Sequence, residues 1–443
     1  MTTQRYAITG LSIRGIYAFL FPILGRASSF GNNDFRQVAG LEAIIEPDAA
    51  RAEAFCQIVG RDIPVYEPAA FLEALDERRI DRVLVTGPDW THHGYLTAAL
   101  GAGRDVVTEK PMVTCSRDAQ SVLAAEKASG RRVLMAHNYR YMPIMQELKR
   151  LLIEGRIGRV TNMEFIYNLD TFHGSSYFFR WNREGGKSGG LNIHKCCHHF
   201  DLANWLIGDE PETLAAFGRL NYYGPRGANR PTSPDGQPLP PAEEKRHCPY
   251  FQRHYAGSYS PDSNDIGTGW DEFRISYGFQ YPPDEPRYIY DDVIDIEDTY
   301  GVVAEYRQGA ILNYSCNFST PWEGFVIGIN GTRGRIEVSH RSDPDPTGKT
   351  VKPRGDARIT VYPLFGGRED VIVAPSEGGH DGADPFMQRD IFLGPSEQSR
   401  RLNLAATSYD GALAVCMGEA VRLALKERRT VDVRALLGEH ARP

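Results

Sequence analysis

The sequence predicts an α/β protein in which a doubly wound parallel sheet precedes a separate α+β domain with an open mixed or antiparallel sheet. Over residues 1–138, short apolar runs alternate with segments of helical spacing. From residue 301 onward, several alternating runs follow one another without helical patterns between them. Strands that alternate with helices form parallel sheets through right-handed crossovers, whereas consecutive strands favour antiparallel or mixed pairing.

The first region, residues 1–138, supplies the elements of the parallel sheet. Its expected strands are the apolar runs at 6–9, 41–45, 82–85, 105–107 and 133–136. Its expected helices carry apolar residues at helical spacing and lie at 14–24, 48–59, 71–76, 92–102 and 116–129. This rhythm of short strands and helices predicts βαβ units, which fits a dinucleotide-binding domain.

The second region, residues 139–405, is expected to form a substrate-binding and oligomerisation domain. A helix is predicted at 141–154, and strands are predicted at 159–170, 301–306, 310–318, 325–330, 334–338 and 358–362. Residues 221–290 are rich in proline, glycine, tyrosine and charge, which is typical of a long irregular insertion. The last segment, 406–443, contains a predicted helix at 409–427 that we expect to return to the first domain.

Composition excludes several function classes. The chain has 443 residues and a formal net charge of −7, and no basic tract stands out, which argues against a nucleic-acid partner. The apolar stretch Ile16–Leu24 contains Pro22 and is too short to span a bilayer. Seven scattered cysteines indicate a reducing compartment rather than a disulfide framework. Without a signal-peptide pattern at its start, the chain is expected to be soluble and cytoplasmic, with no membrane partner.

A glycine-containing turn follows the first expected strand and opens the first expected helix. It reads Gly10, Leu11, Ser12, Ile13, Arg14 and Gly15. Glycines in such a turn let the backbone approach a pyrophosphate, which then binds the free N–H groups at the helix N-terminus. Because Ser12 replaces the middle glycine of the usual motif, a purely structural turn is the alternative.

Glu46 follows the second expected strand and is the candidate ribose-binding acid. A carboxylate at this place accepts hydrogen bonds from the ribose hydroxyls and repels a 2′-phosphate, so it favours NAD over NADP. It lies further from the glycines than the usual spacing of about 20 residues. The alternative is an ordinary acid at a helix entry.

Two motifs carry the expected chemistry. Lys110, in Glu109-Lys110-Pro111, follows the strand at 105–107, and His198 lies in a cluster that begins at His194. Oxidation of a secondary alcohol needs a base that titrates near neutrality, which His198 supplies by type, and a cation that stabilises the developing alkoxide, which Lys110 supplies. His194 and His198 share a helix face at a spacing of four residues.

Two alternatives for the histidine cluster stay open. His198 could be a buried structural residue. The cluster could also hold a metal through His194, Cys197 and His198, but no fourth ligand with a paired spacing is visible, so we predict no metal.

Further candidates line the two sides of the expected cleft, because ligands bind beyond the carboxyl ends of parallel strands. His92 could line the cofactor pocket or only begin a helix. The remaining cofactor candidates are Thr86, Pro88, Glu109 and Asn138. The substrate candidates besides Lys110, His194 and His198 are Arg140, Asp170, His173, Arg180, Trp181 and His380. Aromatic rings pack against sugars and polar groups bond their hydroxyls, although about half of the aromatics should be core.

In their order along the chain, these motifs resemble the Gfo/Idh/MocA oxidoreductase superfamily. The likeness extends to Thr86–His92, His137–Tyr141, Gly189–His194, Asp295–Thr299 and Gly379–Pro385. It implies an N-terminal Rossmann domain, a nicotinamide-dependent reaction on a sugar or polyol, and a homodimer or homotetramer formed through the open sheet. In this family an acid usually stands four residues before the catalytic histidine. His194 holds that position here and Lys195 stands beside it, so a more cationic pocket suited to an anionic or heavily hydroxylated sugar is expected.

Three functions are consistent with these residues. The leading one is an NAD-dependent sugar or polyol dehydrogenase. The second is an NAD-dependent glycoside hydrolase, in which transient oxidation acidifies a neighbouring carbon and permits elimination. The third is a non-catalytic nucleotide-binding scaffold, since a fold does not fix a function.

Overall fold

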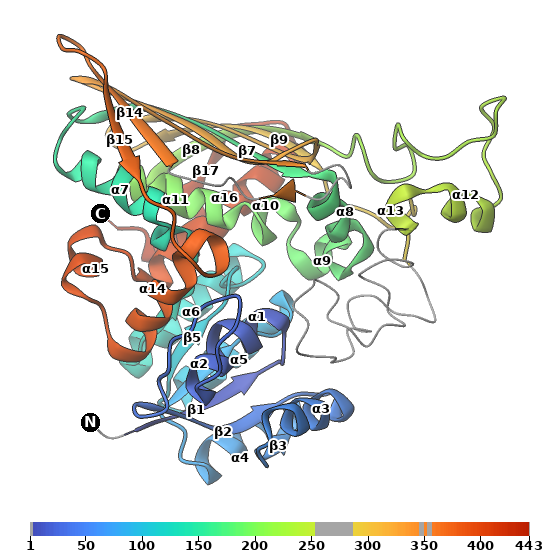
Figure 1. Cartoon of the computed structure of the whole chain (residues 1–443), viewed down its shortest axis with the longest axis vertical. Coiled ribbons are helices and arrows are strands. Elements are labelled where there is room, and N and C mark those ends of the chain that lie inside the picture. Colours follow the sequence, from blue (N-terminus) through green and yellow to red (C-terminus); the bar gives the residue numbers. More distant parts are fainter. Residues whose placement is uncertain (1–2, 253–286, 345–349, 352–356, 443) are drawn as a thin grey trace.

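The computed structural model describes residues 3–252, 287–344, 350–351 and 357–442, and Figure 1 shows two sheets stacked along the long axis of this part of the chain. The first sheet has the strand order β16-β6-β5-β4-β1-β2-β3. Its strands are β1 (Gln4–Thr9), β2 (Ala39–Ile45), β3 (Val65–Tyr66), β4 (Arg82–Val85), β5 (Asp105–Thr108), β6 (Val133–Met135) and β16 (Ala406–Thr407). All pairs are parallel except that of β16 with β6. The α/β fold class is therefore confirmed.

Helices cover the first sheet at the places that the sequence predicts. They are α1 (Ile13–Gly15), α2 (Phe21–Leu24), α3 (Ala49–Val59), α4 (Phe71–Glu77), α5 (His92–Gly101) and α6 (Ser116–Ser129). A π-helical segment, Ile16–Leu20, joins α1 to α2, so the predicted helix at 14–24 is continuous but irregular. The Asp48 carboxylate caps α3 by accepting from the Arg51 N–H, and Gly60 ends this helix in the left-handed region.

The second sheet is mixed and has the order β15-β14-β12-β11-β7-β10-β9-β8-β17, with β13 paired to β12. Its strands are β7 (Val160–Asp170), β8 (Pro211–Arg219), β9 (Thr299–Tyr306), β10 (Ile311–Thr320), β11 (Glu323–Gly331), β12 (Gly334–Pro344), β13 (Thr350–Val351), β14 (Ala357–Pro363), β15 (Glu369–Val373) and β17 (Val431–Asp432). β7 pairs parallel with β10 and antiparallel with β11, which makes the sheet mixed, as expected.

Helices of the second region lie mainly between the two sheets (Figure 1). They are α7 (Pro143–Ile153), α8 (Thr171–Phe179), α9 (Gly185–Ser188), α10 (Leu191–His194), α11 (Cys197–Ile207), α14 (Gly379–Leu393), α15 (Glu397–Leu402), α16 (Ser408–Glu427) and α17 (Val433–Leu437). Two short helices, α12 (Pro241–His247) and α13 (Pro249–Phe251), belong to the predicted insertion at 221–290, whose residues 253–286 lie outside the described residues. We place the domain boundary near residue 138, where the chain leaves the first sheet, as a proposal.

The long C-terminal helix α16 packs against both halves of the molecule. It contacts α6 and β6 of the first region and β8, α10 and α11 of the second. The backbone of Gly418 in α16 accepts a hydrogen bond of 2.7 Å from the Asn192 amide, and a Cβ at Gly418 would meet the Asn192 carbonyl oxygen at 2.6 Å. A capping box of Thr407 and Asp410 fixes the start of the helix. None of the helices in the described part of the chain has the length and hydropathy needed to cross a membrane.

Candidate active site

The loops after β1 and β4 touch at the point where the strand order reverses. Gly10 has a φ of +81°, and a Cβ there would lie 2.6 Å from the Cα of Gly87. The Thr86 hydroxyl donates a hydrogen bond of 2.7 Å to the Gly10 carbonyl. Dinucleotides bind at this switch point of doubly wound sheets, where the backbone must come close to the pyrophosphate. The lack of room for a side chain at Gly10 therefore fits a dinucleotide cofactor.

The rest of the glycine turn is held by Ser12 and Glu46. The Ser12 hydroxyl oxygen accepts a hydrogen bond of 2.9 Å from the Gly15 N–H. Glu46 is buried at the end of β2, and its carboxylate accepts a bond of 2.7 Å from the Leu11 N–H. The sequence-predicted acid is thus beside the glycine turn despite its long spacing, because the extra residues form the connection from α2 to β2. Ile13 begins α1 in this turn.

Arg14 lies in an ion network that links the two regions. Its guanidinium is 2.8 Å from Glu109 and 2.7 Å from Asp384, and its Nη1 is 3.4 Å from Nδ1 of His380. Burial raises the pKa of the Asp384 carboxyl, but Arg14 and His380 outweigh it and hold that pKa well below its usual range. The Asn138 amide donates a bond of 3.2 Å to the same carboxylate. The predicted cofactor residues Arg14 and Asn138 therefore share the Asp384 carboxylate, and Glu109 joins this network through Arg14.

Lys110 lies directly after β5 and points toward the helix cluster. The Lys110 ammonium donates a bond of 3.0 Å to the His194 carbonyl oxygen, and the Lys110–Pro111 peptide is cis. Nδ1 of His194 lies 2.5 Å from the Asp89 carboxylate. Burial lowers the pKa of His194 well below its usual value, Lys110 lowers it further, and burial raises the pKa of Asp89. His194 is therefore neutral and paired with a carboxyl group, so it does not supply the extra cation that the sequence led us to expect.

The additional cation of the site is Lys195. It is 5 % exposed, and its ammonium donates a bond of 3.1 Å to the Tyr139 hydroxyl and lies 5.2 Å from the Tyr167 ring centre. Within the described ranges, no carboxylate lies within ion-pair distance of the Lys195 or Lys110 ammonium group. Buried charges are normally paired, so this arrangement fits a ligand with an oxygen that carries negative charge.

His198 lies beside these two lysines. Its ring stacks on Tyr139 with centroids 4.2 Å apart and an angle of 8° between the planes. Burial lowers the pKa of His198 well below its usual value, and Lys110 and Lys195 lower it further, so the imidazole is neutral. Nδ1 of His198 is buried and has no hydrogen-bond partner among the described residues. A neutral imidazole with a free ring nitrogen is able to accept a proton.

Comparison with known proteins agrees with this geometry. Residues 24–137 match the description "oxidoreductase family, NAD-binding Rossmann fold", and residues 149–433 match "oxidoreductase family, C-terminal alpha/beta domain". A protein of Bacillus subtilis (strain 168) named "Putative oxidoreductase YteT" is 37 % identical over 430 residues, which cover 96 % of this chain and 97 % of that protein. The chain belongs to the Gfo/Idh/MocA oxidoreductase family.

Other proteins are more distantly similar. Inositol 2-dehydrogenase 4 of Saccharopolyspora erythraea is 33 % identical over 39 % of this chain and 47 % of its own length. Levoglucosan dehydrogenase, solved in complex with NADH, superimposes with a TM-score of 0.63 and 16 % identity over 98 % of this chain and 99 % of the other. Aldose-aldose oxidoreductase from Caulobacter crescentus gives a TM-score of 0.61 and 17 % identity over 97 % and 100 %. These two solved structures share the fold of this family member.

Four predicted site residues make structural contacts with the protein itself. Arg140 is 1 % exposed and binds both oxygens of Asp201 at 2.8 and 2.6 Å, so it is not available to a substrate. The Asp170 carboxylate caps α8 by accepting from the backbone N–H groups of its first turn. His92 is buried with its two ring nitrogens 2.8 and 2.9 Å from the carbonyl oxygens of Pro111 and Gly87, so it joins two loops at the start of α5. The Pro88 carbonyl likewise accepts the Thr91 hydroxyl, at 2.7 Å.

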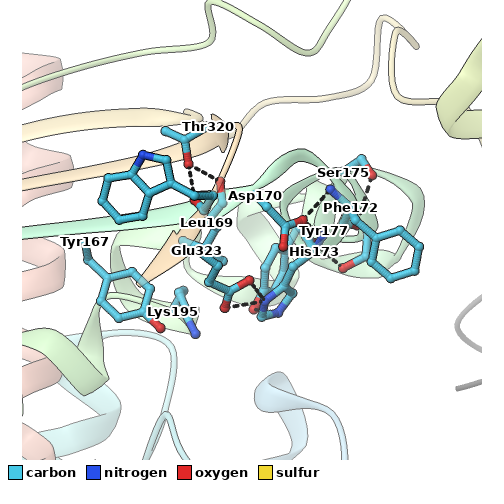
Figure 2. A network of polar contacts seen from close by, with 12 residues as sticks. Tyr167, Leu169, Asp170, Phe172, His173, Ser175, Tyr177, Lys195, Thr320 and Glu323 are labelled. Atoms are coloured by element: carbon cyan, nitrogen blue, oxygen red, sulfur yellow. Dashed lines mark hydrogen bonds and ion pairs between the residues drawn. The ribbon is translucent and has the colours of Figure 1, made fainter. Parts of the chain in front are cut away.

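The remaining substrate candidates lie on α8 and the turn that follows it. His173 pairs with Glu323 of β11, as Figure 2 shows. The Arg180 guanidinium lies 4.8 Å from the ring centre of Tyr177 and donates to the hydroxyl of Ser176. The Trp181 ring is edge-on to His194 at 5.5 Å, and its buried indole N–H has no hydrogen-bond partner in the described ranges. The structure thus brings Trp181 and Arg180 close to His194, whereas His173 is connected to it through Tyr177.

The metal alternative is not supported for the residues that suggested it. His194 is paired with Asp89, and the Cys197 thiol lies 3.6 Å from the His194 carbonyl oxygen. Among the described residues, the group whose donor atoms lie within 4.8 Å of one another is Cys196, His199 and Cys316, on the buried side of α11. Burial raises the pKa of the Cys196 thiol well above its usual value, which disfavours the thiolate that metals require.

The sequence reasoning missed Asp89, Tyr139 and Glu323, whereas it singled out Lys195 beside His194 as part of a more cationic pocket. Asp89 lies in the motif Thr86–His92 and Tyr139 in the motif His137–Tyr141. Their position next to predicted site residues at strand ends is the signal that could have identified them. Glu323 comes from a strand about 150 residues after His173, and no local pattern connects the two.

Proposed function

We propose that the protein is an NAD-dependent dehydrogenase that oxidises a secondary alcohol of a sugar or polyol, or reduces the corresponding carbonyl. The observation that carries this proposal is the position of Lys110 and neutral His198 in one cluster beyond β5, next to the glycine turn. The dehydrogenases among the relatives support the same reaction class.

Each residue has a defined task in this reaction. The nicotinamide, when bound, supplies the hydride acceptor. The Lys110 ammonium donates a hydrogen bond to the reacting oxygen and stabilises its negative charge, which is worth most where water is excluded. His198 accepts the hydroxyl proton at its free ring nitrogen. Lys195, Trp181 and Arg180 position the remaining hydroxyl or acidic groups of the substrate.

Glu46 supports NAD as the cofactor in preference to NADP. Its carboxylate lies beside the Leu11 N–H, where a 2′-phosphate would meet a buried negative charge. The residues that would hold the dinucleotide are Gly10, Ser12, Ile13, Gly15, Glu46 and Thr86.

The glycoside hydrolase alternative needs the same lysine and histidine. The relatives named above are oxidoreductases and dehydrogenases, and their names do not favour the hydrolase. The scaffold alternative leaves the buried Lys195 and the partly buried Lys110 without a task. An assay separates all three: the purified protein is incubated with NAD and a panel of polyols, aldoses and sugar acids, and NADH is followed by absorbance. Net NADH supports the dehydrogenase. Glycoside cleavage without net NADH would establish the hydrolase, and NAD binding without either reaction would establish the scaffold.

We also propose a homodimer or homotetramer formed through the outer face of the second sheet. Cross-strand register aligns Phe217, Gly301, Ser315, Ile166 and Val326 in one row over five strands. The apolar members of this row, Phe217, Ile166 and Val326, are 85 %, 42 % and 40 % exposed. A flat apolar row on an exposed sheet is suited to a second copy of the same chain.

A further inference from the structure

Three side chains on the substrate side of the site form a continuous polar chain (Figure 2). Nδ1 of His173 lies 3.0 and 3.1 Å from the two carboxylate oxygens of Glu323. On the opposite edge of the ring, Nε2 of His173 lies 3.1 Å from the hydroxyl oxygen of Tyr177. A carboxylate from β11, an imidazole and a phenol from α8 are therefore joined in line.

The phenol end of this chain lies on the wall of the active site. Tyr177 is 5 % exposed, and its ring is edge-on to the His194 ring with centroids 5.6 Å apart. The carbonyl of this same His194 accepts the Lys110 ammonium at 3.0 Å. Tyr177 and Lys110 therefore both contact His194, and the Lys110 charge acts on the Tyr177 phenol.

We propose that Tyr177, held by His173 and Glu323, is a second proton acceptor of the active site and acts beside His198. This inference rests on the proposed dehydrogenase function. In the oxidation, the substrate O–H bond breaks and its proton moves to the phenolate oxygen of Tyr177. The C–H bond of the same carbon breaks, its electron pair leaves as hydride to the nicotinamide, and a C=O bond forms. Tyr177 returns the proton to solvent after the product leaves.

The groups that face Tyr177 explain how a phenol acts as a base. They are His173 and Arg180 from α8 and its end, Lys110 from the loop after β5, His194 and Lys195 from α10 and its end, Tyr167 from β7, and Glu323 beyond His173. Burial raises the pKa of Tyr177, but His173, Lys195 and Lys110 together outweigh it and lower that pKa to about 8. Burial has the opposite effect on His173 and lowers its pKa, because it disfavours the charged imidazolium. The charge of Glu323 outweighs this effect and raises the pKa of His173 to about 9. His173 is therefore an imidazolium that donates to the phenolate.

The two acceptors suit different pH ranges. His198 is neutral at all pH values above its lowered pKa, so it is available at neutral pH but is a weak base. The ionised fraction of Tyr177, which is the form that accepts a proton, increases as pH rises through about 8. The rate of oxidation should therefore keep rising in mildly alkaline solution.

A spectroscopic titration tests the ionisation without cofactor or substrate. The ultraviolet absorbance of tyrosinate is recorded against pH for the wild type and for Tyr177→Phe, and the difference isolates this phenol. We expect one ionisation with a pKa of about 8 in the difference, which moves upward in Glu323→Gln because His173 loses its charge. Tyr95→Phe, which removes a partly buried tyrosine of α5 away from the site, is the matched control and should leave the signal near pH 8 unchanged. A Tyr177 signal that appears only near the ordinary tyrosine pKa would overturn the proposal.

Kinetics test the proton transfer itself. In Tyr177→Phe, kcat/KM for oxidation should lose its alkaline rise, about a tenfold loss at pH 9, and should retain most of its value at pH 7, where His198 acts. In Glu323→Gln the rise should move to higher pH rather than disappear, which a purely structural role would not produce. An unchanged alkaline rise in Tyr177→Phe would refute the proposal. If no substrate is oxidised at all, the proposed function fails, while the titration still decides whether Tyr177 ionises.

Discussion

Two polar networks in this molecule have similar components and different consequences. In the first, Arg140 binds Asp201 at 2.8 and 2.6 Å, Asp410 at 3.3 Å and the Asn403 carbonyl at 3.1 Å. In the second, Glu323 and His173 end on Tyr177, and the His173 side chain is 37 % exposed. The first network is closed, because each arm of its cation meets an oxygen of the protein. The second ends on a phenol at the site wall. A closed network stabilises the fold, whereas an open one is available for chemistry.

The closed network should give the largest effect on stability. Arg140→Met leaves Asp201 buried without its cation, so we expect a loss of about 3–5 kcal/mol in the free energy of unfolding, measured by urea denaturation. The double variant Arg140→Met with Asp201→Leu should recover most of it, because the buried carboxylate of Asp201 is removed together with its cation. If Arg140→Met is instead stable and has a strongly raised KM, Arg140 binds the substrate, as the sequence predicts.

Lys110, like the second network, is available for chemistry, so its removal should lower the turnover rate and leave folding stability unchanged. In Lys110→Ala the reacting oxygen loses its cation, so we expect kcat to fall about 10²–10³-fold while the urea midpoint stays the same. Lys187→Ala, which removes a half-exposed lysine of α9, should keep full activity and serves as the control. Retained turnover in Lys110→Ala would contradict our catalytic assignment.

The comparison extends to the outer face of the second sheet, through which we propose that two copies of the chain associate. Val326→Lys places a charge in the exposed row and should weaken self-association by about 1–3 kcal/mol, because the charge must be desolvated. Light scattering over a concentration series measures the change. Leu72→Lys on α4, an equally exposed apolar position in the first region, should have no effect. An assembly that is unchanged in Val326→Lys would place the interface elsewhere.

The smallest effect should come from the pH dependence of the open network. His173 has its pKa raised to about 9 by Glu323, so its contribution to stability is fully present below pH 6.5 and is lost as pH rises through about 9. Because the side chain is about one third exposed, we expect less than about 1 kcal/mol. The urea midpoints of the wild type and of Glu323→Gln should differ below pH 6.5 and should become similar above about pH 9. A difference that grows with pH would reverse the assigned sign.

The sequence was most informative where structure is local. The strands at Arg82–Val85 and Asp105–Thr108 and the helix Ser116–Ser129 agree with the prediction, because each is an uninterrupted periodic run. The two-residue strands β3, β16 and β17 are too short to show a period. β8 was missed although it alternates, because its apolar positions are mostly alanine and it adjoins a segment rich in proline.

At the site, motif position identified the neighbourhood but not the partner of each side chain. Arg140 follows a strand end exactly as a ligand-binding residue would, yet Asp201, 61 positions later, occupies it. The charge of His194 depends on Asp89, and the ionisation of Tyr177 depends on Glu323 through His173. Such pairs are set by tertiary packing between distant segments, which the periodicity of one sequence does not contain.

The shared helix α16 has a consequence for protein engineering. A chimera that exchanges residues 1–138 between two relatives keeps the recipient's α16 against a foreign α6 and β6, so the exchanged piece meets a mismatched surface. Carrying residues 406–443 together with 1–138 would preserve that surface but would transfer the mismatch to β8, α10 and α11. Recombination of specificity in this chain is therefore better attempted by grafting single loops than by swapping whole domains.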